Sequence, residues 1–341
     1  MKSAPQRITE VKSMGGKDGM DRRSFMRKGA LAVALSAAPI VSSPRGAIAG
    51  SAGKFATLID LTKCDGCAEL GIPKCVEACR RENASRFPEP RKPIRDLWPQ
   101  KTHDDWSEKR DVTDKLTPYN WITVQKVQVD GQILHIPRRC MHCDNPPCAN
   151  LCPFGALRKY SDGAVVIDHA SCLGGAKCKS VCPWQIPQRQ SGVGIYLKLH
   201  PIPAGGGVMY KCDLCHSRLE KGLLPACIEA CKGRKGEEAP MILAQRQKIA
   251  ELAGEAKRRG FYTYGEKENG GTATVYLSRI PFEKINSALS SADQKPHMAR
   301  VEPKLMEANR WSKGFIFAPL GAALGALGLV LARRANGKEE K

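Results

Sequence analysis

The chain has 341 residues with 15 cysteines, 32 glycines and 23 prolines, whereas aromatic residues make up only 6%. This composition fits a loop-rich protein built around cofactors better than a protein with one large apolar core. The formal net charge of +20 suits an anionic membrane surface, an acidic partner or bound anionic clusters, but no motif of combined aromatic and basic residues supports nucleic-acid binding.

Residues 1–49 have the features of a twin-arginine export signal. Arg22 and Arg23 form the arginine pair, although Asp21 stands where Ser or Thr is usual, and residues 29–41 form an apolar run. Residues 47–49 supply a small-x-small cleavage pattern. The alternative is a chance basic segment before an apolar helix. Because this route exports folded proteins, the signal indicates a cofactor that is inserted before export.

All 15 cysteines fall into four groups. In chain order these are Cys64, Cys67, Cys75 and Cys79; Cys140, Cys143, Cys148 and Cys152; Cys172, Cys178 and Cys182; and Cys212, Cys215, Cys227 and Cys231. Every group ends in C-x3-C, and three groups open with C-x2-C. The bacterial ferredoxin pattern is C-x2-C-x2-C-x3-C-P, in which the fourth cysteine ligates the neighbouring cluster. The spacing therefore predicts four iron–sulfur clusters.

The third group lacks one ligand. Its spacing would be regular if residue 175 were a cysteine, but that residue is Gly175. One iron corner then has no protein ligand, which predicts a 3Fe-4S cluster or, as the lesser option, a 4Fe-4S cluster with a water-derived or foreign ligand. The missing ligand also accounts for the odd number of cysteines.

Cysteines at such spacings have three other possible uses. Zinc sites also contain C-x2-C pairs, but they usually combine two such pairs. Disulfides suit an exported protein, but an odd count in clustered groups argues against them. Cys212-x2-Cys215-His216 matches the c-type haem attachment pattern, yet Cys227 and Cys231 complete it as a cluster group. We expect His142 to be solvated or to support a ligand rather than to be one.

Other segments carry weaker signals. Residues 80–120 are charged and rich in proline, which predicts a surface insert that either docks a partner or is merely solvated. Residues 121–137 predict a hairpin around the Asp130-Gly131 turn. Short strands are expected at residues 165–167 and 274–277, a helix at 242–259 and a polar linker at 286–313.

Gly314 to Ala332 is an uncharged run long enough to span a membrane as a helix. The alternative is a buried soluble helix. Gly321 and Gly325 would share one face, a spacing that favours close packing against another membrane helix. Together with the export signal, this run predicts a body on the periplasmic side of the inner membrane and a cytoplasmic tail at 333–341. No motif of a substrate-converting site is present.

Three short strings in the chain resemble a known family. Residues 140–153 (CMHCDNPPCANLCP), residues 211–215 (KCDLC) and residues 225–231 (PACIEAC) resemble the four-cluster ferredoxin-like electron-transfer subunits of periplasmic respiratory oxidoreductases. The plan of the whole chain, with residues 265–272 (GEKENGGT), is most similar to the iron–sulfur subunit of hydrogenase-2-type nickel–iron hydrogenases.

The resemblance implies that the first group pairs with the fourth and the second with the third. The implied ligand sets are Cys64, Cys67, Cys75 and Cys231; Cys212, Cys215, Cys227 and Cys79; Cys140, Cys143, Cys148 and Cys182; and Cys172, Cys178 and Cys152, the last for the 3Fe-4S centre. We call these sets A, B, C and D in the same order. The wide loop between Cys67 and Cys75 departs from the common short form.

The expected fold is α+β, with two ferredoxin-like double-cluster modules and a C-terminal transmembrane helix. The expected organisation is a signal (1–49), the first group with insert and hairpin (50–139), an inner module (140–190), the fourth group with its extension (191–285), a linker (286–313), an anchor (314–332) and a tail (333–341). The resemblance implies a non-catalytic subunit that relays electrons between a catalytic subunit and a membrane subunit that is quinone-reactive or a cytochrome b. The catalytic subunit would belong to a hydrogenase or, alternatively, to a molybdopterin oxidoreductase, and the direction of electron flow stays open.

Overall fold

The computed structural model describes residues 53–97, 100–199 and 205–303. The expected signal at 1–49, the anchor at 314–332 and the tail at 333–341 lie outside these residues. Among the described residues, no helix is long and apolar enough to cross a membrane.

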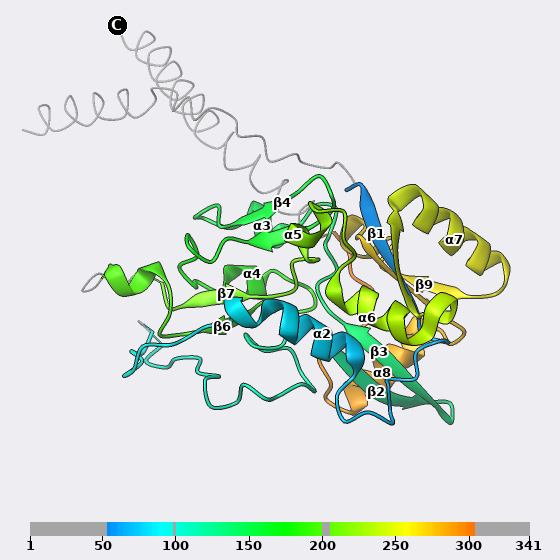
Figure 1. Cartoon of the computed structure of the whole chain (residues 1–341), viewed down its shortest axis with the longest axis horizontal. Coiled ribbons are helices and arrows are strands. Elements are labelled where there is room, and N and C mark those ends of the chain that lie inside the picture. Colours follow the sequence, from blue (N-terminus) through cyan, green and yellow to red (C-terminus); the bar gives the residue numbers. More distant parts are fainter. Residues whose placement is uncertain (1–52, 98–99, 200–204, 304–341) are drawn as a thin grey trace, which may run out of the picture. The chain divides into compact units, whose positions relative to one another are not determined.

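A four-stranded sheet joins the two ends of the described chain (Figure 1). Its order is β8 (Met241–Gln245), β1 (Phe55–Asp60), β10 (Thr274–Ser278) and β9 (Tyr262–Tyr264). The pairing of β1 with β10 is parallel, with Thr57 opposite Thr274, and the other two pairings are antiparallel. The strand expected at 274–277 is confirmed, whereas the sequence analysis missed β1.

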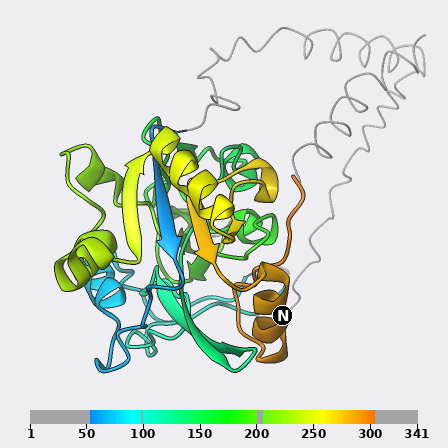
Figure 2. The ribbon, with the colours of Figure 1, turned by 90° about the vertical axis from the view of Figure 1, so that its right-hand side faces the viewer.

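Helix α7 (Arg246–Arg258) covers one face of this sheet (Figure 2). Its apolar positions Ile249, Ala253 and Ala256 are buried against Leu58 and Val275, as expected for an amphipathic helix. The helix begins later than the sequence pattern predicts. Residues 242–245, the apolar start of the predicted helix, belong to β8 because they pair with β1.

The hairpin is confirmed. Strands β2 (Thr123–Val129) and β3 (Gln132–Arg138) pair in antiparallel register. Asp130 and Gly131 have φ angles of 49° and 80°, as a type I′ turn requires. Helix α8 (Phe282–Ser291) packs against β2, so residues 286–291 are helical and not part of a linker.

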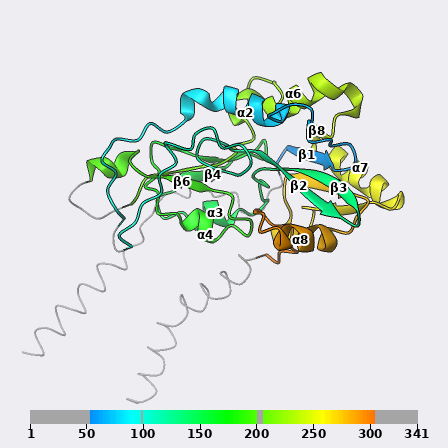
Figure 3. The same cartoon turned by 90° about the horizontal axis from the view of Figure 1, so that it is seen from below.

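The C-x3-C end of each cysteine group lies on a short helix or begins on one and ends just after it. Helices α2 (Lys74–Asn83) and α6 (Ala226–Lys235) pack against each other, and so do the shorter α3 (Pro147–Asn150) and α4 (Lys177–Ser180) (Figure 3). Two small antiparallel pairs accompany them: β4 (Leu157–Lys159) with β5 (Val165–Ile167), and β6 (Gln188–Gln190) with β7 (Val208–Tyr210). Strand β5 is the one expected at 165–167. The remaining elements are α5 (His216–Leu219) and the 3-10 turns η1 (Ala84–Arg86), η2 (Ile195–Lys198), η3 (Gly236–Glu238) and η4 (Glu268–Gly270).

The insert at 80–120 begins inside α2 and returns onto it. Arg80 on α2 donates to the carbonyl oxygens of Tyr119 (2.9 Å) and Arg110 (2.7 Å). The Tyr119 hydroxyl donates to Pro88 O at 2.9 Å, and the Tyr119 side chain is buried. The described part of the insert is therefore anchored to the fold at both of its ends.

The packing of α7 on the sheet predicts a large effect of one core substitution. Ile249→Ala should lower the free energy of unfolding by about 2–5 kcal/mol because it removes a fully buried side chain and leaves a cavity. The exposed Glu255 on the same helix supplies the control, since Glu255→Ala should stay within about 0.5 kcal/mol. Anaerobic thermal unfolding of both variants measures the difference, and equal midpoints would contradict this packing.

Candidate cluster-binding sites

The cysteines of set A line one cavity. Cys64 and Cys67 come from the loop after β1, Cys75 from α2 and Cys231 from α6. The loop turns tightly at Gly66, which has a φ of 67°, and a Cβ atom there would overlap the His135 ring. Glycine is therefore required for this loop to close beneath the hairpin.

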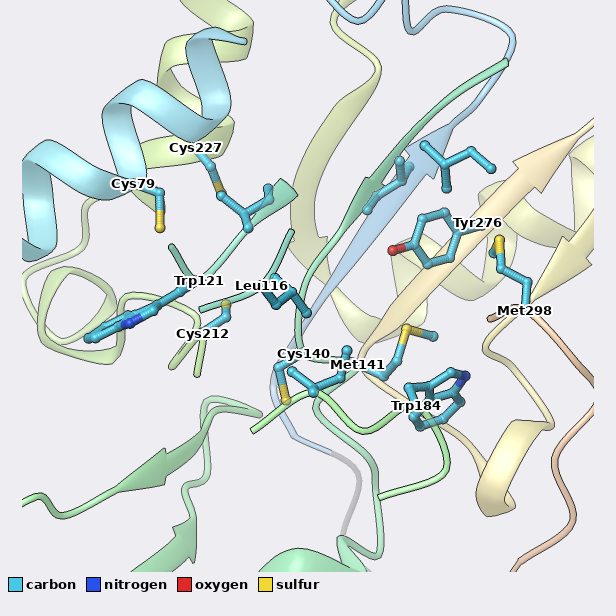
Figure 4. Close-up of a cluster of buried hydrophobic side chains, with 14 of the residues drawn as sticks. Cys79, Leu116, Trp121, Cys140, Met141, Trp184, Cys212, Cys227, Tyr276 and Met298 are labelled. Carbon is cyan, nitrogen blue, oxygen red and sulfur yellow. The ribbon is translucent and has the colours of Figure 1, made fainter. Parts of the chain in front are cut away.

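The cysteines of set B lie where α2 and α6 meet. Cys79 lies near Cys212, Cys215 and Cys227. Figure 4 shows Cys79 and Cys227 on the two helices, with Cys212 on the segment nearby. Because positions i and i+4 share a helix face, α2 presents Cys75 to set A and Cys79 to set B. Helix α6 presents Cys227 to set B and Cys231 to set A, in the reverse order.

The cysteines of set C line a second cavity. Cys140 and Cys143 come from the loop after β3, Cys148 from α3 and Cys182 from the residues after α4. The apolar side chains of Met141, Trp184 and Ile186 also line this cavity, and the Trp184 indole donates to the Tyr264 hydroxyl at 2.7 Å. These neighbours exclude water, which influences the redox potential of a bound cluster.

The three cysteines of set D also lie together. Cys178 interacts with both Cys172 and Cys152, and Met209 N–H donates to the Cys172 sulfur at 3.4 Å. A Cβ atom at Gly175 would meet no other atom within 4 Å. No steric conflict therefore dictates glycine at this position, and a fourth cysteine would have room.

The four sets follow one another through the molecule. Sets A and B adjoin where Cys75 approaches Cys227. Sets B and C adjoin where Cys212 approaches Cys140. Sets C and D meet at α3, since Cys148 lies on it and Cys152 follows it directly. Sets A and B combine residues 64–79 with residues 212–231, whereas sets C and D combine residues 140–152 with residues 172–182.

Burial makes these thiols weak acids. It raises the pKa of the Cys64 thiol to about 12 and the pKa of the Cys182 and Cys227 thiols to about 11. A coordinated metal deprotonates a thiol outright. The raised pKa values therefore suit cysteines that become thiolates when they bind iron, rather than cysteines that remain as free thiolates. In the part of the chain that the structure describes, no three His, Cys, Asp or Glu side chains are close enough to hold a single metal ion. This wider spacing is compatible with cube-sized cofactors.

The two histidines beside cysteines have partners of their own. His142 is fully buried, which excludes the solvated alternative and leaves that of a residue supporting a ligand. Its Nδ1 accepts from Val165 N–H at 2.9 Å. His216 Nδ1 lies 2.6 Å from an Asp162 carboxylate oxygen, and its ring contacts that of Tyr160.

Residues 265–272 support the loop of the second group. Cys143 forms a β-bridge with Thr272, and Asp144 N–H donates to Gly271 O at 2.9 Å. The Lys159 ammonium donates to the carbonyl oxygens of Cys143 and Asp144, both at 2.9 Å. The sequence analysis missed the role of Lys159, for which the sequence offers no signal.

Comparison with known proteins finds similarity to iron–sulfur proteins. Models of the 4Fe-4S dicluster domain match residues 63–156 and 131–237. The chain is 31% identical over 315 residues to the hydrogenase-2 operon protein HybA of Escherichia coli O157:H7, covering 78% of this chain and 83% of that protein. It is 32% identical over 218 residues to a tetrathionate reductase subunit of Salmonella typhimurium, covering 62% of this chain and 70% of that protein. A protein of Nitratidesulfovibrio vulgaris is 31% identical over 274 residues, and there the match covers 77% of this chain and 65% of that protein.

The contacts of Lys159 predict that it stabilises the Cys140–Cys143 loop. Lys159→Met leaves two carbonyl oxygens without their donor, which should lower the free energy of unfolding by about 1–3 kcal/mol. The exposed Lys248 on α7 is the control, because Lys248→Met removes only a surface ammonium and its exposed ion pair with Glu251. Thermal unfolding under anaerobic conditions checks both, and an unchanged midpoint for Lys159→Met would refute the role.

Proposed function

Because this chain belongs to the family of ferredoxin-like iron–sulfur electron-transfer subunits that includes HybA, we propose that it relays electrons between a catalytic subunit and a membrane subunit. Sets A to D hold the four clusters, and the clusters supply one-electron chemistry. The residues of the chain bind the clusters, set the distances between them and keep water from their sulfurs.

The observation that carries this proposal is the continuous order of the four cysteine sets. Adjacent sets interact through named pairs such as Cys75 with Cys227 and Cys212 with Cys140. An electron that enters at set A or set D can pass through every set to the opposite end. A protein that binds separate structural metal ions would not need its metal sites to follow one another in this way.

The proposed catalytic partner is a nickel–iron hydrogenase. The match to HybA, which covers 83% of that protein, favours this partner. The alternative is the equivalent subunit of a molybdopterin-type respiratory oxidoreductase, and the similarity to the tetrathionate reductase subunit favours a reductase. Electrons leave to, or arrive from, a quinone-reactive or cytochrome b subunit in the membrane.

We also propose the location expected from the sequence and the expected domain organisation, with the linker beginning after α8 at residue 292. Residues 1–49 direct export by the twin-arginine route, and residues 314–332 anchor the body to the periplasmic side of the inner membrane. Three 4Fe-4S clusters occupy sets A, B and C, and one 3Fe-4S cluster occupies set D. The two modules are sets A with B and sets C with D.

Metal analysis tests the relay directly. The full chain, purified anaerobically with detergent, should contain about 15 irons and a similar amount of acid-labile sulfide per chain. The proposal fails if iron is absent and zinc is bound in stoichiometric amount. Mass spectrometry of proteins that co-purify with the chain separates the two enzyme contexts, since one predicts nickel–iron hydrogenase subunits and the other a molybdopterin subunit.

The open space at Gly175 allows a sharp test of set D. Gly175→Cys should abolish the EPR signal of an oxidised 3Fe-4S cluster and add about one iron per chain, because the new thiolate completes the ligand set. Gly233→Cys is the control, since a Cβ atom there also meets nothing within 4 Å but residue 233 belongs to no ligand set. A parent protein without the 3Fe-4S signal would overturn the assignment.

A further inference from the structure

Two buried cations stand next to cluster ligands. Arg139 directly precedes Cys140 of set C, and Lys211 directly precedes Cys212 of set B. Arg139 is 1% exposed and Lys211 is 4% exposed. Burying a charge is costly unless an opposite charge compensates it.

Neither cation has a carboxylate as a hydrogen-bond partner in the described part of the chain. Arg139 donates to the Thr57 hydroxyl at 2.6 Å and to the Cys212 sulfur at 3.8 Å, and its Nε has no partner among the described residues. The Lys211 ammonium donates to the carbonyl oxygens of Val165 and Cys212. The direct contacts of the two charges are a cysteine sulfur and neutral oxygens, and the nearby Asp213 carboxylate is paired with Arg86.

Each of the two cations lies beside the cysteine set of the other loop. Arg139 belongs to the loop of set C, but its guanidinium contacts Cys212 of set B. Lys211 belongs to the loop of set B, but its side chain lines the cavity of set C, together with Cys140 and Cys148. Each loop thus supplies the cation of the neighbouring set.

His142 adds a neutral donor at the same boundary. Because Val165 N–H donates to Nδ1 at 2.9 Å, the ring proton sits on Nε2, which lies 3.5 Å from the Cys212 sulfur. Hydrogen bonds to cluster sulfurs and nearby charges are among the features that set reduction potentials.

We propose that Arg139 and Lys211 are crossed potential-setting residues: Arg139, with His142, raises the reduction potential of the cluster in set B, and Lys211 raises that of the cluster in set C. This inference rests on the proposed function. Reduction adds one electron and one negative charge to a cluster, and no bond forms or breaks. A buried cation stabilises the added charge, so it favours the reduced cluster. The crossing also requires both loops to be in place before either cluster reaches its final potential.

Potentiometric EPR titration of the full chain, purified anaerobically with detergent, tests the crossing. Ligand variants first show which reduction step of the titration belongs to which cluster. Cys215→Ser should shift the reduction step of the cluster in set B, and Cys143→Ser should shift that of the cluster in set C. Arg139→Gln should then lower the step marked by Cys215→Ser, and Lys211→Met the step marked by Cys143→Ser. We expect at least a tenfold change in the ratio of reduced to oxidised cluster at fixed potential, which is about 59 mV for one electron.

Arg138 supplies the matched control. It is as deeply buried as Arg139, but it lies over the Tyr276 ring and donates to His297 O at 2.9 Å. Arg138→Gln should leave both steps in place. If Arg139→Gln does not retain iron, His142→Leu replaces it, since it removes a donor to Cys212 without removing a charge and should lower the same step by less.

The outcomes are separable. A parent protein without iron would refute the proposed function. Iron-loaded variants whose steps do not move, or an Arg139→Gln variant that moves the set C step instead, would refute the crossing alone. An equal shift in Arg138→Gln would show that any buried cation suffices, which also overturns the assignment.

Discussion

The proposed arrangement of clusters depends on one constraint, the exchange of cluster ligands between paired helices. Helices α2 and α6 each carry two cysteines four residues apart, and each helix presents one cysteine to set A and one to set B. The helices must therefore lie side by side, although about 150 residues separate them. The pairing of β1 with β10, which joins the start and the end of the described chain, is consistent with this requirement. The inner pair, α3 and α4, repeats the arrangement within one short stretch.

Much of this arrangement could be predicted from cysteine spacing and a family resemblance. The C-x3-C ends placed two cysteines on each of α2 and α6 and one on each of α3 and α4, with a second just beyond. The Asp130-Gly131 turn fixed the hairpin because few residues accept two positive φ angles in succession. Other features left no local signal. The start of the 242–259 segment became β8 because an unpaired edge of β1 was available to it, and α8 replaced part of the expected linker because β2 offered a surface to cover. Such choices depend on partners distant in sequence, which periodicity does not reveal.

The surroundings of the cysteines could not be predicted from the sequence and are visible only in the structure. A basic residue before the first cysteine is visible in the sequence at Arg139 and Lys211, but the sequence does not say which set each side chain faces. Arg138 and Arg139 are neighbours of the same type, yet one lies over Tyr276 and the other contacts Cys212. Along this extended segment, the direction of each side chain therefore decides which arginine can act on the reduction potential of a cluster. His142 likewise gains its role from Val165, which fixes its proton on the nitrogen that faces Cys212.

The central claim is that four clusters lie in the order A–B–C–D, with ligands exchanged within each pair. An anomalous-difference map at the iron edge, from crystals of the protein grown without oxygen, tests this most directly. The account predicts four iron-containing peaks in that order, with Cys231 on the cluster of Cys64 and Cys79 on the cluster of Cys212. Single-atom peaks, or clusters ligated only by cysteines of one group, would contradict it.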